Sequence, residues 1–243
     1  MRQLILHSSF FILKAPAYSS FFILHYSFLK RQPNYQLPII NFPYMIAIID
    51  YNTGNIRSVI NALERLGRTD YVLTADKEVI RSATHVLLPG VGEAATAMQE
   101  LRNRELDVLI PTLTQPVLGI CIGTQLLCQS SEEGDAECLG IFPTRVRRFP
   151  AGSGLKIPHM GWNTITGLRG PLFEGIADGA YVYYVHSFRP DCCEATAATT
   201  SYGEAFSGSL WHGNFFGTQF HPEKSGPVGQ RILRNFLSID NCN

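Results

Sequence analysis

The chain has 243 residues, enough for one domain with a substantial core. It carries 20 basic and 20 acidic side chains, and charged residues make up only 16% of it. This balance argues against a protein that binds nucleic acid through a basic surface. The six cysteines show no CxxC spacing typical of metal sites, and the neighbours Cys192 and Cys193 favour a reducing, cytosolic location over a disulfide framework.

The first 44 residues differ from the rest of the chain. They contain no acidic residue, and the stretch 8–13 recurs at 19–24, a repeat of eleven residues. No apolar run reaches the roughly 18 residues that span a bilayer. The hypothesis that these residues anchor the protein in a membrane is therefore supported by composition alone. A basic, acid-poor N-terminus also fits a targeting segment. We favour a third interpretation: Met45 is the initiator, the domain covers 45–243, and residues 1–44 are upstream sequence or a disordered extension.

Apolar runs and helical spacing alternate through the first half of the domain. They predict strands near 46–49, 71–73 and 85–88, and helices over 56–66, over 94–101 and up to residue 110. This alternation predicts parallel strand pairing in an α/β fold. After Gly140 the pattern changes to short strands: 141–149, 160–166, 181–186, 195–200, 205–211 and 214–220. We expect these strands to extend the sheet in a mixed or antiparallel sense, and a helix over 228–237 to close the domain.

A candidate nucleophile stands where a buried strand, 117–120, turns into a helix that starts at Ile122 and continues to Cys128. Gly119 and Gly123 flank Cys121 at two residues on either side, which is the spacing of a nucleophile elbow. Such a turn leaves no room for a Cβ at either glycine. The helix N-terminus favours the thiolate form of a cysteine. A buried structural cysteine is the alternative.

The domain contains several histidines that could take the proton of the thiol: His85, His159, His186, His212 and His221. His221 is favoured because it ends a strand that Pro222 prevents from continuing. Glu223, two residues further on, returns to the same side of an extended backbone, where its carboxylate can orient the imidazole. A solvated Glu223 beside a strand-capping histidine is the alternative.

Backbone N–H groups are the candidate donors to a developing oxyanion. The N–H of Ile122 follows the nucleophile, and the loop 90–92 follows the strand 85–88. Glycines on either side of Val91 let a peptide plane reorient at low cost. Because active sites lie at the carboxyl ends of parallel strands, we expect this loop and Cys121 to share one crevice. An ordinary turn is the alternative.

The segments 89–92, 119–125 and 221–223 together resemble the signatures of the class I (triad) glutamine amidotransferases, which hydrolyse glutamine and pass ammonia to a synthase. The resemblance runs from Met45 to about Leu237 and implies a flavodoxin-like α/β fold with a central, mixed, mostly parallel sheet and flanking helices. Further stretches are similar to the glutaminase subunits of imidazole glycerol phosphate synthases, enzymes of histidine biosynthesis: 50–55, 158–163, 183–188 and 221–225. The alternatives are a glutaminase of another synthase, of the anthranilate or aminodeoxychorismate type, and a catalytically silent binding subunit.

The resemblance implies a role for each matching residue. Cys121 is the nucleophile, His221 the base and acid, and Glu223 the orienting carboxylate, with Val91, Gly92 and Ile122 as the oxyanion hole. The implied substrate residues are Gly90, Gln125, Glu133, Ser187 and Phe188. The implied partner interface contains Asn55, Trp162, Tyr183 and Lys224. The partner is a cyclase subunit with a (β/α)8 barrel that binds a phosphoribosyl-type substrate, and neither a metal nor a cofactor is implied.

Five positions depart from the family pattern without touching the triad. Thr124 replaces a usual methionine, Phe188 a common tyrosine, Asn52 a usual glycine, and Glu93 with Ala94 a pair of one small and one aromatic residue. Phe188 cannot offer a hydroxyl to the substrate, although its backbone can still bind. We expect the oxyanion loop to adopt its active form only when the partner is loaded, which would prevent wasteful hydrolysis.

Overall fold

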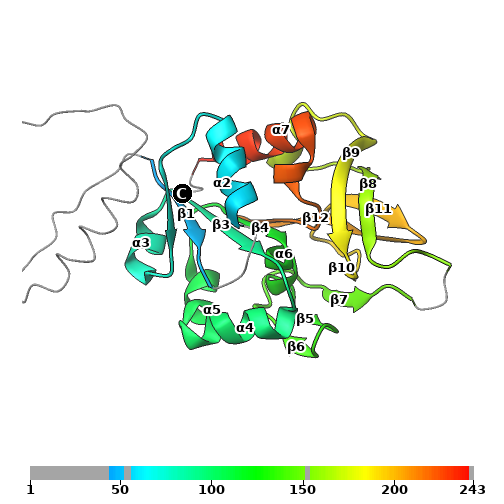
Figure 1. Ribbon diagram of the computed structural model, residues 1–243, viewed down its shortest axis with the longest axis horizontal. Coiled ribbons are helices and arrows are strands. Elements are labelled where there is room, and N and C mark those ends of the chain that lie inside the picture. The colour runs from blue at the N-terminus through cyan, green and yellow to red at the C-terminus, as the bar shows by residue number, and fades with distance from the viewer. Residues whose placement is uncertain (1–43, 52–55, 151–153, 241–243) are drawn as a thin grey trace, which may run out of the picture. The chain divides into compact units, whose positions relative to one another are not determined.

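The computed structural model describes residues 44–51, 56–150 and 154–240, which belong to one compact unit, Phe42–Asn243 (Figure 1). The predicted N-terminal extension, residues 1–44, lies outside the described residues apart from Tyr44, so the predictions about it stay predictions. Within the described ranges, no helix is both long and apolar enough to cross a membrane.

A seven-stranded sheet forms the centre of this unit, in the order β11-β12-β13-β4-β3-β1-β2. Its strands are β1 (Ile46–Ile49), β2 (Tyr71–Thr74), β3 (His85–Gly90), β4 (Val117–Cys121), β11 (Thr196–Tyr202), β12 (Glu204–His212) and β13 (Phe215–Thr218). The strands from β2 to β13 pair in parallel, and β12 and β11 add two antiparallel pairings at one edge. The predicted mixed, mostly parallel sheet is confirmed.

Helices flank this sheet, with α2 and α7 on one side and α4 and α5 on the other (Figure 1). The helices are α2 (Ile56–Arg65), α3 (Lys77–Ser82), α4 (Ala94–Asn103), α5 (Leu106–Leu109), α6 (Ile122–Leu126) and α7 (Gly226–Leu237), with 3-10 turns η1 (Ile110–Thr112), η2 (Pro171–Phe173) and η3 (Pro222–Lys224). Helix α3 was not predicted, although Asp76 caps it by accepting from two backbone N–H groups. Helix α6 is shorter than predicted, because its last turn tightens: the N–H of Leu127 bonds the carbonyl of Thr124.

Three of the six strands predicted after Gly140 do not join the central sheet, so the prediction that all of them extend it is wrong. Strand β7 (Arg145–Arg148) pairs with β10 (Phe188–Pro190) and β5 (Ser130–Ser131), which pairs with β6 (Ala136–Glu137). Strands β8 (His159–Ile165) and β9 (Ala180–His186) form an antiparallel pair of their own. The side chains explain this separation: β7 exposes three arginines and β8 exposes a tryptophan, which a strand covered on both faces would bury.

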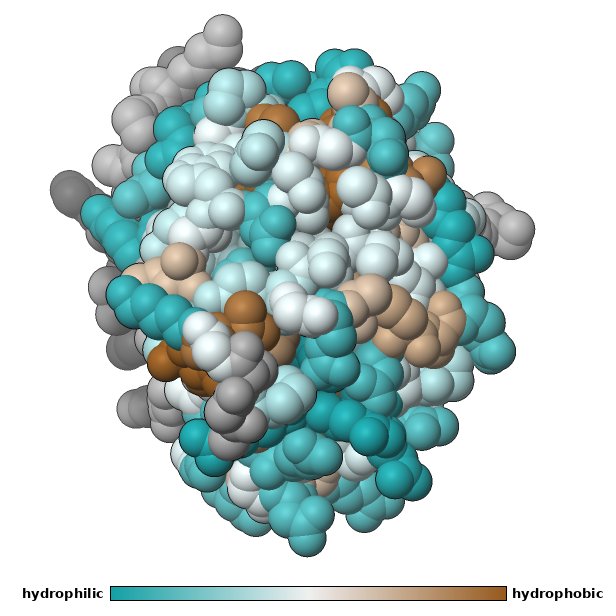
Figure 2. Space-filling model, turned by 90° about the vertical axis from the view of Figure 1, so that its right-hand side faces the viewer, coloured by the Kyte–Doolittle hydropathy of each residue, from teal (hydrophilic) through white to brown (hydrophobic). Residues whose placement is uncertain are grey.

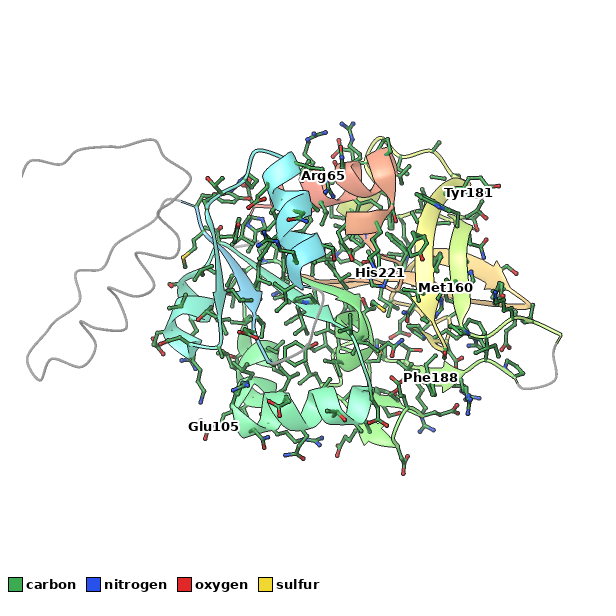
Figure 3. All side chains as sticks on the ribbon, in the orientation of Figure 1. Arg65, Glu105, Met160, Tyr181, Phe188 and His221 are labelled. Carbon is green, nitrogen blue, oxygen red and sulfur yellow. The ribbon has the colours of Figure 1, made fainter. Side chains whose placement is uncertain are left out.

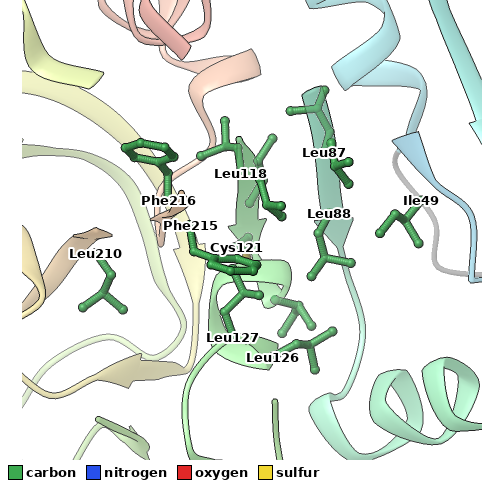
Figure 4. Close-up of a cluster of buried hydrophobic side chains, with 14 of the residues drawn as sticks. Ile49, Leu87, Leu88, Leu118, Cys121, Leu126, Leu127, Leu210, Phe215 and Phe216 are labelled. Carbon is green, nitrogen blue, oxygen red and sulfur yellow. The ribbon is translucent and has the colours of Figure 1, made fainter. Parts of the chain in front are cut away.

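The packing of the central strands sets the position of the candidate nucleophile. Leucine and phenylalanine side chains from β3, β4 and β13 form the core around the elbow, with Cys121 at the end of β4 (Figure 4). The register pairs Gly90 of β3 directly with Cys121. The carboxyl ends of these two strands therefore bring the glycine loop and the elbow to one edge of the sheet, as expected of such folds.

Candidate active site

Cys121 occupies a strained backbone conformation between β4 and α6. Its φ is 54° and its ψ is −109°, values that residues other than glycine rarely adopt. A Cβ on Gly123 would lie 1.7 Å from the carbonyl oxygen of Leu88, and one on Gly119 would lie 2.8 Å from the backbone of Gly123. Both glycines thus permit the close packing of β3, β4 and α6 that a nucleophile elbow requires.

His221 and Glu223 form a buried pair beside this elbow. Nδ1 of His221 lies 2.8 Å from Oε1 of Glu223, and both side chains are almost fully buried. Because Nδ1 is occupied, Nε2 is the ring nitrogen left to interact with the Cys121 side chain. It is buried and has no hydrogen-bond partner in the described part of the chain. Burial opposes a charged imidazole, but the contacts with Cys121 and Glu223 outweigh it and raise the pKa of His221. The arrangement therefore favours a protonated imidazole beside Cys121.

A pocket of about 330 Å³ opens at Cys121. Its wall contains many of the predicted site residues: Val91, Gly92, Cys121, Ile122, Gln125, Glu133, Ser187, Phe188, His221 and Lys224. Pro158, Val185 and His186 also line it and were not predicted to do so. Residues from widely separated segments of the chain therefore meet around one thiol.

The other predicted residues lie behind or outside this wall. Gly90 packs under the elbow, where a Cβ would come within 2.6 Å of the hydroxyl oxygen of Tyr51. Glu223 contacts the pocket only through His221. Trp162 and Tyr183 lie on β8 and β9, with their ring centroids 6.0 Å apart. Asn55 lies outside the described residues.

A network of side-chain amides runs under the pocket floor. Nε2 of Gln125 donates to the carbonyl oxygen of Phe188 at 3.0 Å and to Oε1 of Gln219 at 2.9 Å. Oε1 of Gln125 is buried and has no partner among the described residues. Gln219, in turn, places Nε2 3.8 Å from the sulfur of Cys121. Sequence reasoning missed Gln219, although its place two residues before His221 on an extended segment predicts the same side of the backbone.

Two of the remaining histidines form a second buried network. Nδ1 of His186 lies 2.7 Å from the carbonyl oxygen of Phe188, which can only accept, so Nδ1 carries the proton. Nε2 of His186 then accepts from Nδ1 of His159 at 2.9 Å, and Nε2 of His159 accepts from Asn163 at 3.3 Å. Burial lowers the pKa of His186 to about 3 and that of His159 to about 4. Both rings are therefore neutral at physiological pH.

This histidine pair predicts that acid destabilises the fold. Because the folded pKa values lie below the ordinary value of 6.5, the unfolded chain binds protons that the folded chain excludes. The contribution of this pair to the free energy of unfolding should be complete above about pH 6.5 and should be lost as the pH drops toward about 4. Urea denaturation at several pH values across this window measures the slope.

The substitution His186→Asn isolates one proton of this effect, because the asparagine amide replaces Nδ1 as a donor but does not titrate. We expect the slope of the unfolding free energy against pH to fall by the amount that corresponds to about one proton bound on unfolding. His212→Asn is the matched control, because His212 is exposed on β12. An unchanged slope in His186→Asn would show that His186 is protonated equally in the folded and unfolded chains.

Glu133 connects the pocket to α4, the helix that follows the predicted oxyanion loop. Its Oε2 accepts from the backbone N–H of Ala94 at 3.1 Å, at the start of α4. Burial raises the pKa of Glu133, the N–H of Ala94 opposes that rise, and the nearby Glu93 adds to it. The unusual residue Glu93 thus acts electrostatically on a carboxylate in the pocket wall.

Comparison with known proteins agrees with this geometry. Residues 47–239 match the family described as glutamine amidotransferase class-I. The imidazole glycerol phosphate synthase subunit HisH of Bacteroides thetaiotaomicron is 54% identical over 195 residues, which cover 80% of this chain and 99% of that protein. The chain belongs to the HisH family of class I glutamine amidotransferases. The HisH subunit of Shewanella loihica is 45% identical over 203 residues, covering 79% of this chain and 90% of that protein.

Solved structures share the fold of this HisH-family chain at lower identity. A putative GMP synthase protein from Thermoplasma acidophilum has a TM-score of 0.63 at 21% identity, covering 80% of this chain and 92% of that one. The crystal structure of a glutamine amidotransferase has a TM-score of 0.61 at 19% identity, covering 79% of this chain and 97% of that one. The predicted fold is confirmed, and the relatives confirm the assignment to the glutaminase subunits of imidazole glycerol phosphate synthase.

Proposed function

We propose that this chain hydrolyses L-glutamine at Cys121, with His221 and Glu223 as the other members of the triad, and delivers ammonia to a cyclase subunit. The observation that carries the proposal is the meeting of a strained cysteine and a histidine in one pocket, with the histidine bonded to a buried glutamate behind it. The match to HisH proteins supplies the substrate and the kind of partner.

In the proposed reaction the Cys121 thiolate attacks the side-chain amide carbon of glutamine, and the amide oxygen becomes an oxyanion. The N–H of Ile122, at the first position of α6, has no acceptor within its own helix and is available to that oxygen. The loop 91–92 lines the pocket and offers a second donor. His221 gives its proton to the departing ammonia and then takes one from the water that hydrolyses the thioester, releasing glutamate.

The polar groups of the pocket wall suit the two ends of glutamine. Oε1 of Gln125 is a buried acceptor without a partner in the described part of the chain, and Glu133 is an acid, so both fit the donors of an α-ammonium group or an amide. Lys224 lines the same pocket with a positive charge. The carbonyl oxygen of Phe188 already accepts from Gln125 and His186, so the backbone N–H groups of Ser187 and Phe188 are the better candidates for the substrate.

The proposed cyclase interface is the outer face of β8 and β9. Met160, Trp162 and Tyr181 are exposed by 60%, 54% and 60% of their surface, an unusual concentration of large apolar groups. Met160 and Tyr181 are visible on these outer strands in Figure 3, and Figure 2 shows hydrophobic patches among polar atoms on this side of the molecule. Lys224 lies both in the pocket wall and 6.0 Å from the ring of Tyr183. The face therefore adjoins the place where ammonia is released.

The proposal includes control by the partner. Binding of a loaded cyclase would favour the form of loop 91–92 that binds the oxyanion, because only a differential interaction can shift such an equilibrium. A thiol nucleophile must also stay reduced, which supports the predicted cytoplasmic location.

The experiment measures glutamate release by the full chain on its own, with its cyclase partner, and with the cyclase and its phosphoribosyl-type nucleotide ligand. We expect hydrolysis to be strongest in the loaded complex and the cyclase product to form with glutamine as the only nitrogen source. Equal rates with and without the ligand would contradict the control step. Binding to the cyclase without hydrolysis in any mixture would identify a silent subunit.

A further inference from the structure

Gln219 is held against the nucleophile by the central sheet. It lies between the end of β13 and His221, its side chain is fully buried, and its backbone N–H bonds the carbonyl oxygen of Gly208 at 2.9 Å. Its Nε2 lies 3.8 Å from Sγ of Cys121. The distance is within the range of a hydrogen bond to sulfur, so this amide touches the atom that the proposed reaction uses.

The direction of the Gln219 amide follows from its neighbours. The carbonyl oxygen of Phe188 can only accept, so Gln125 must present its Nε2 to it. The second hydrogen of that Nε2 then points to Gln219, which must present Oε1. The NH₂ group of Gln219 is left facing the sulfur. The amide is thus oriented by two contacts, and its direction does not depend on an arbitrary choice between oxygen and nitrogen.

The Phe188 carbonyl is itself fixed from the other side. The neutral ring of His186 donates to it at 2.7 Å, and His159 and Asn163 complete that chain of donors. All of these groups donate toward the Phe188 carbonyl. Within the described residues, the network therefore leaves no alternative acceptor that would turn the Gln219 amide around.

The sulfur of Cys121 is placed between an acceptor and a donor. The carbonyl oxygen of Val185 lies 3.9 Å from Sγ and accepts from the S–H of the neutral thiol. The amide N–H of Gln219 does the opposite, because it is best satisfied by the thiolate. The other titratable groups near the sulfur are His221 with Glu223 behind it, and His186, Glu133 and Lys224 in the pocket wall.

We propose that Gln219 is a positioning residue of the nucleophile: its side-chain amide donates a hydrogen bond to Cys121 and holds the sulfur as a thiolate aimed into the pocket. The proposal rests on the proposed function in taking that thiolate as the nucleophile. Gln219 would then be an uncharged hydrogen-bond donor that stabilises the thiolate together with His221. The proposal also explains why an uncharged polar side chain is buried there at 0% exposure.

The test is the pH dependence of alkylation of Cys121 by iodoacetamide in the full chain, followed by mass spectrometry of the peptide that contains Cys121. Replacing Gln219 by leucine removes the donor, so the midpoint of alkylation should rise by about one pH unit. Gln219→Glu keeps the size and the acceptor for Gln125 but turns an anion toward the sulfur, so its midpoint should rise further. Circular dichroism checks that each variant is folded.

Gln115→Leu is the matched control, because Gln115 is also buried and its Nε2 bonds the carbonyl oxygen of Ile80, away from the pocket. Its midpoint should equal that of the unaltered chain. Midpoints in both Gln219 variants that match Gln115→Leu would overturn the proposal, and if Gln219→Leu does not fold, Gln219→Glu decides alone. Alkylation needs no glutamine, so the midpoints would still test the role of Gln219 if the chain showed no glutaminase activity.

Discussion

Cys121→Ala is expected to reduce glutamate release by the complex on the order of 10⁴-fold or more, because the substitution removes the proposed nucleophile and leaves only binding and the proposed oxyanion donors. The fold should survive, since the alanine is smaller and keeps the same backbone. Glutamate release with the cyclase and its ligand measures the loss, and thermal denaturation of the variant measures the fold.

Cys128→Ala is the control for this prediction. Cys128 is fully buried near the end of α6, and its sulfur bonds the carbonyl oxygen of Thr124 away from the pocket. Its loss should leave turnover within a few-fold of the unaltered chain, apart from a modest cost in stability. Comparable activity in Cys121→Ala and Cys128→Ala would remove Cys121 from the reaction.

Gly123→Ala is expected to destabilise the chain by more than about 4 kcal/mol, a cost that few single substitutions reach. The new Cβ would lie 1.7 Å from the carbonyl oxygen of Leu88, and backbone on both sides would have to move. The clash can be relieved only by moving α6 away from β3, so the overpacking would disturb the central sheet. Urea denaturation of the full chain gives the change in the free energy of unfolding.

Gly213→Ala separates crowding from backbone strain. Gly213 has a φ of +57°, but a Cβ there would meet nothing within 4 Å. Its substitution should therefore cost only about 1–2 kcal/mol, the penalty of the left-handed conformation. Equal losses in the two variants would mean that crowding at the elbow contributes nothing.

Local sequence was enough to predict the parts of the site that lie within one segment. The pattern around Cys121 predicts the elbow because both glycines and the strand-to-helix change lie close to it in the chain. The pairing of His221 with Glu223 follows similarly from their spacing and from Pro222. The structure brings Cys121 and His221 to one pocket, and Glu223 lies behind it, bonded to Nδ1 of His221.

Contacts between distant segments could not be predicted in the same way. The Gln125–Gln219 bond joins residues 94 positions apart, and the His159–His186 bond joins residues 27 apart. The His159–His186 bond depends on the pairing of β8 with β9, and the Gln125–Gln219 bond depends on the placement of β13 beside β4. Short strands with alternating polarity predict their own existence but not their partners, which is why the assignment of β7, β8 and β9 to the central sheet is wrong.

The most direct test of the triad is to trap the acyl-enzyme. The full chain with its cyclase and ligand is mixed with glutamine, quenched in acid during turnover and digested, and each cysteine peptide is weighed by mass spectrometry. We expect a γ-glutamyl thioester on Cys121 and on no other cysteine, because Cys121 is the cysteine that lies beside His221 at the pocket. Glutamate release without an adduct on Cys121, or with one on another residue, would contradict the proposed site.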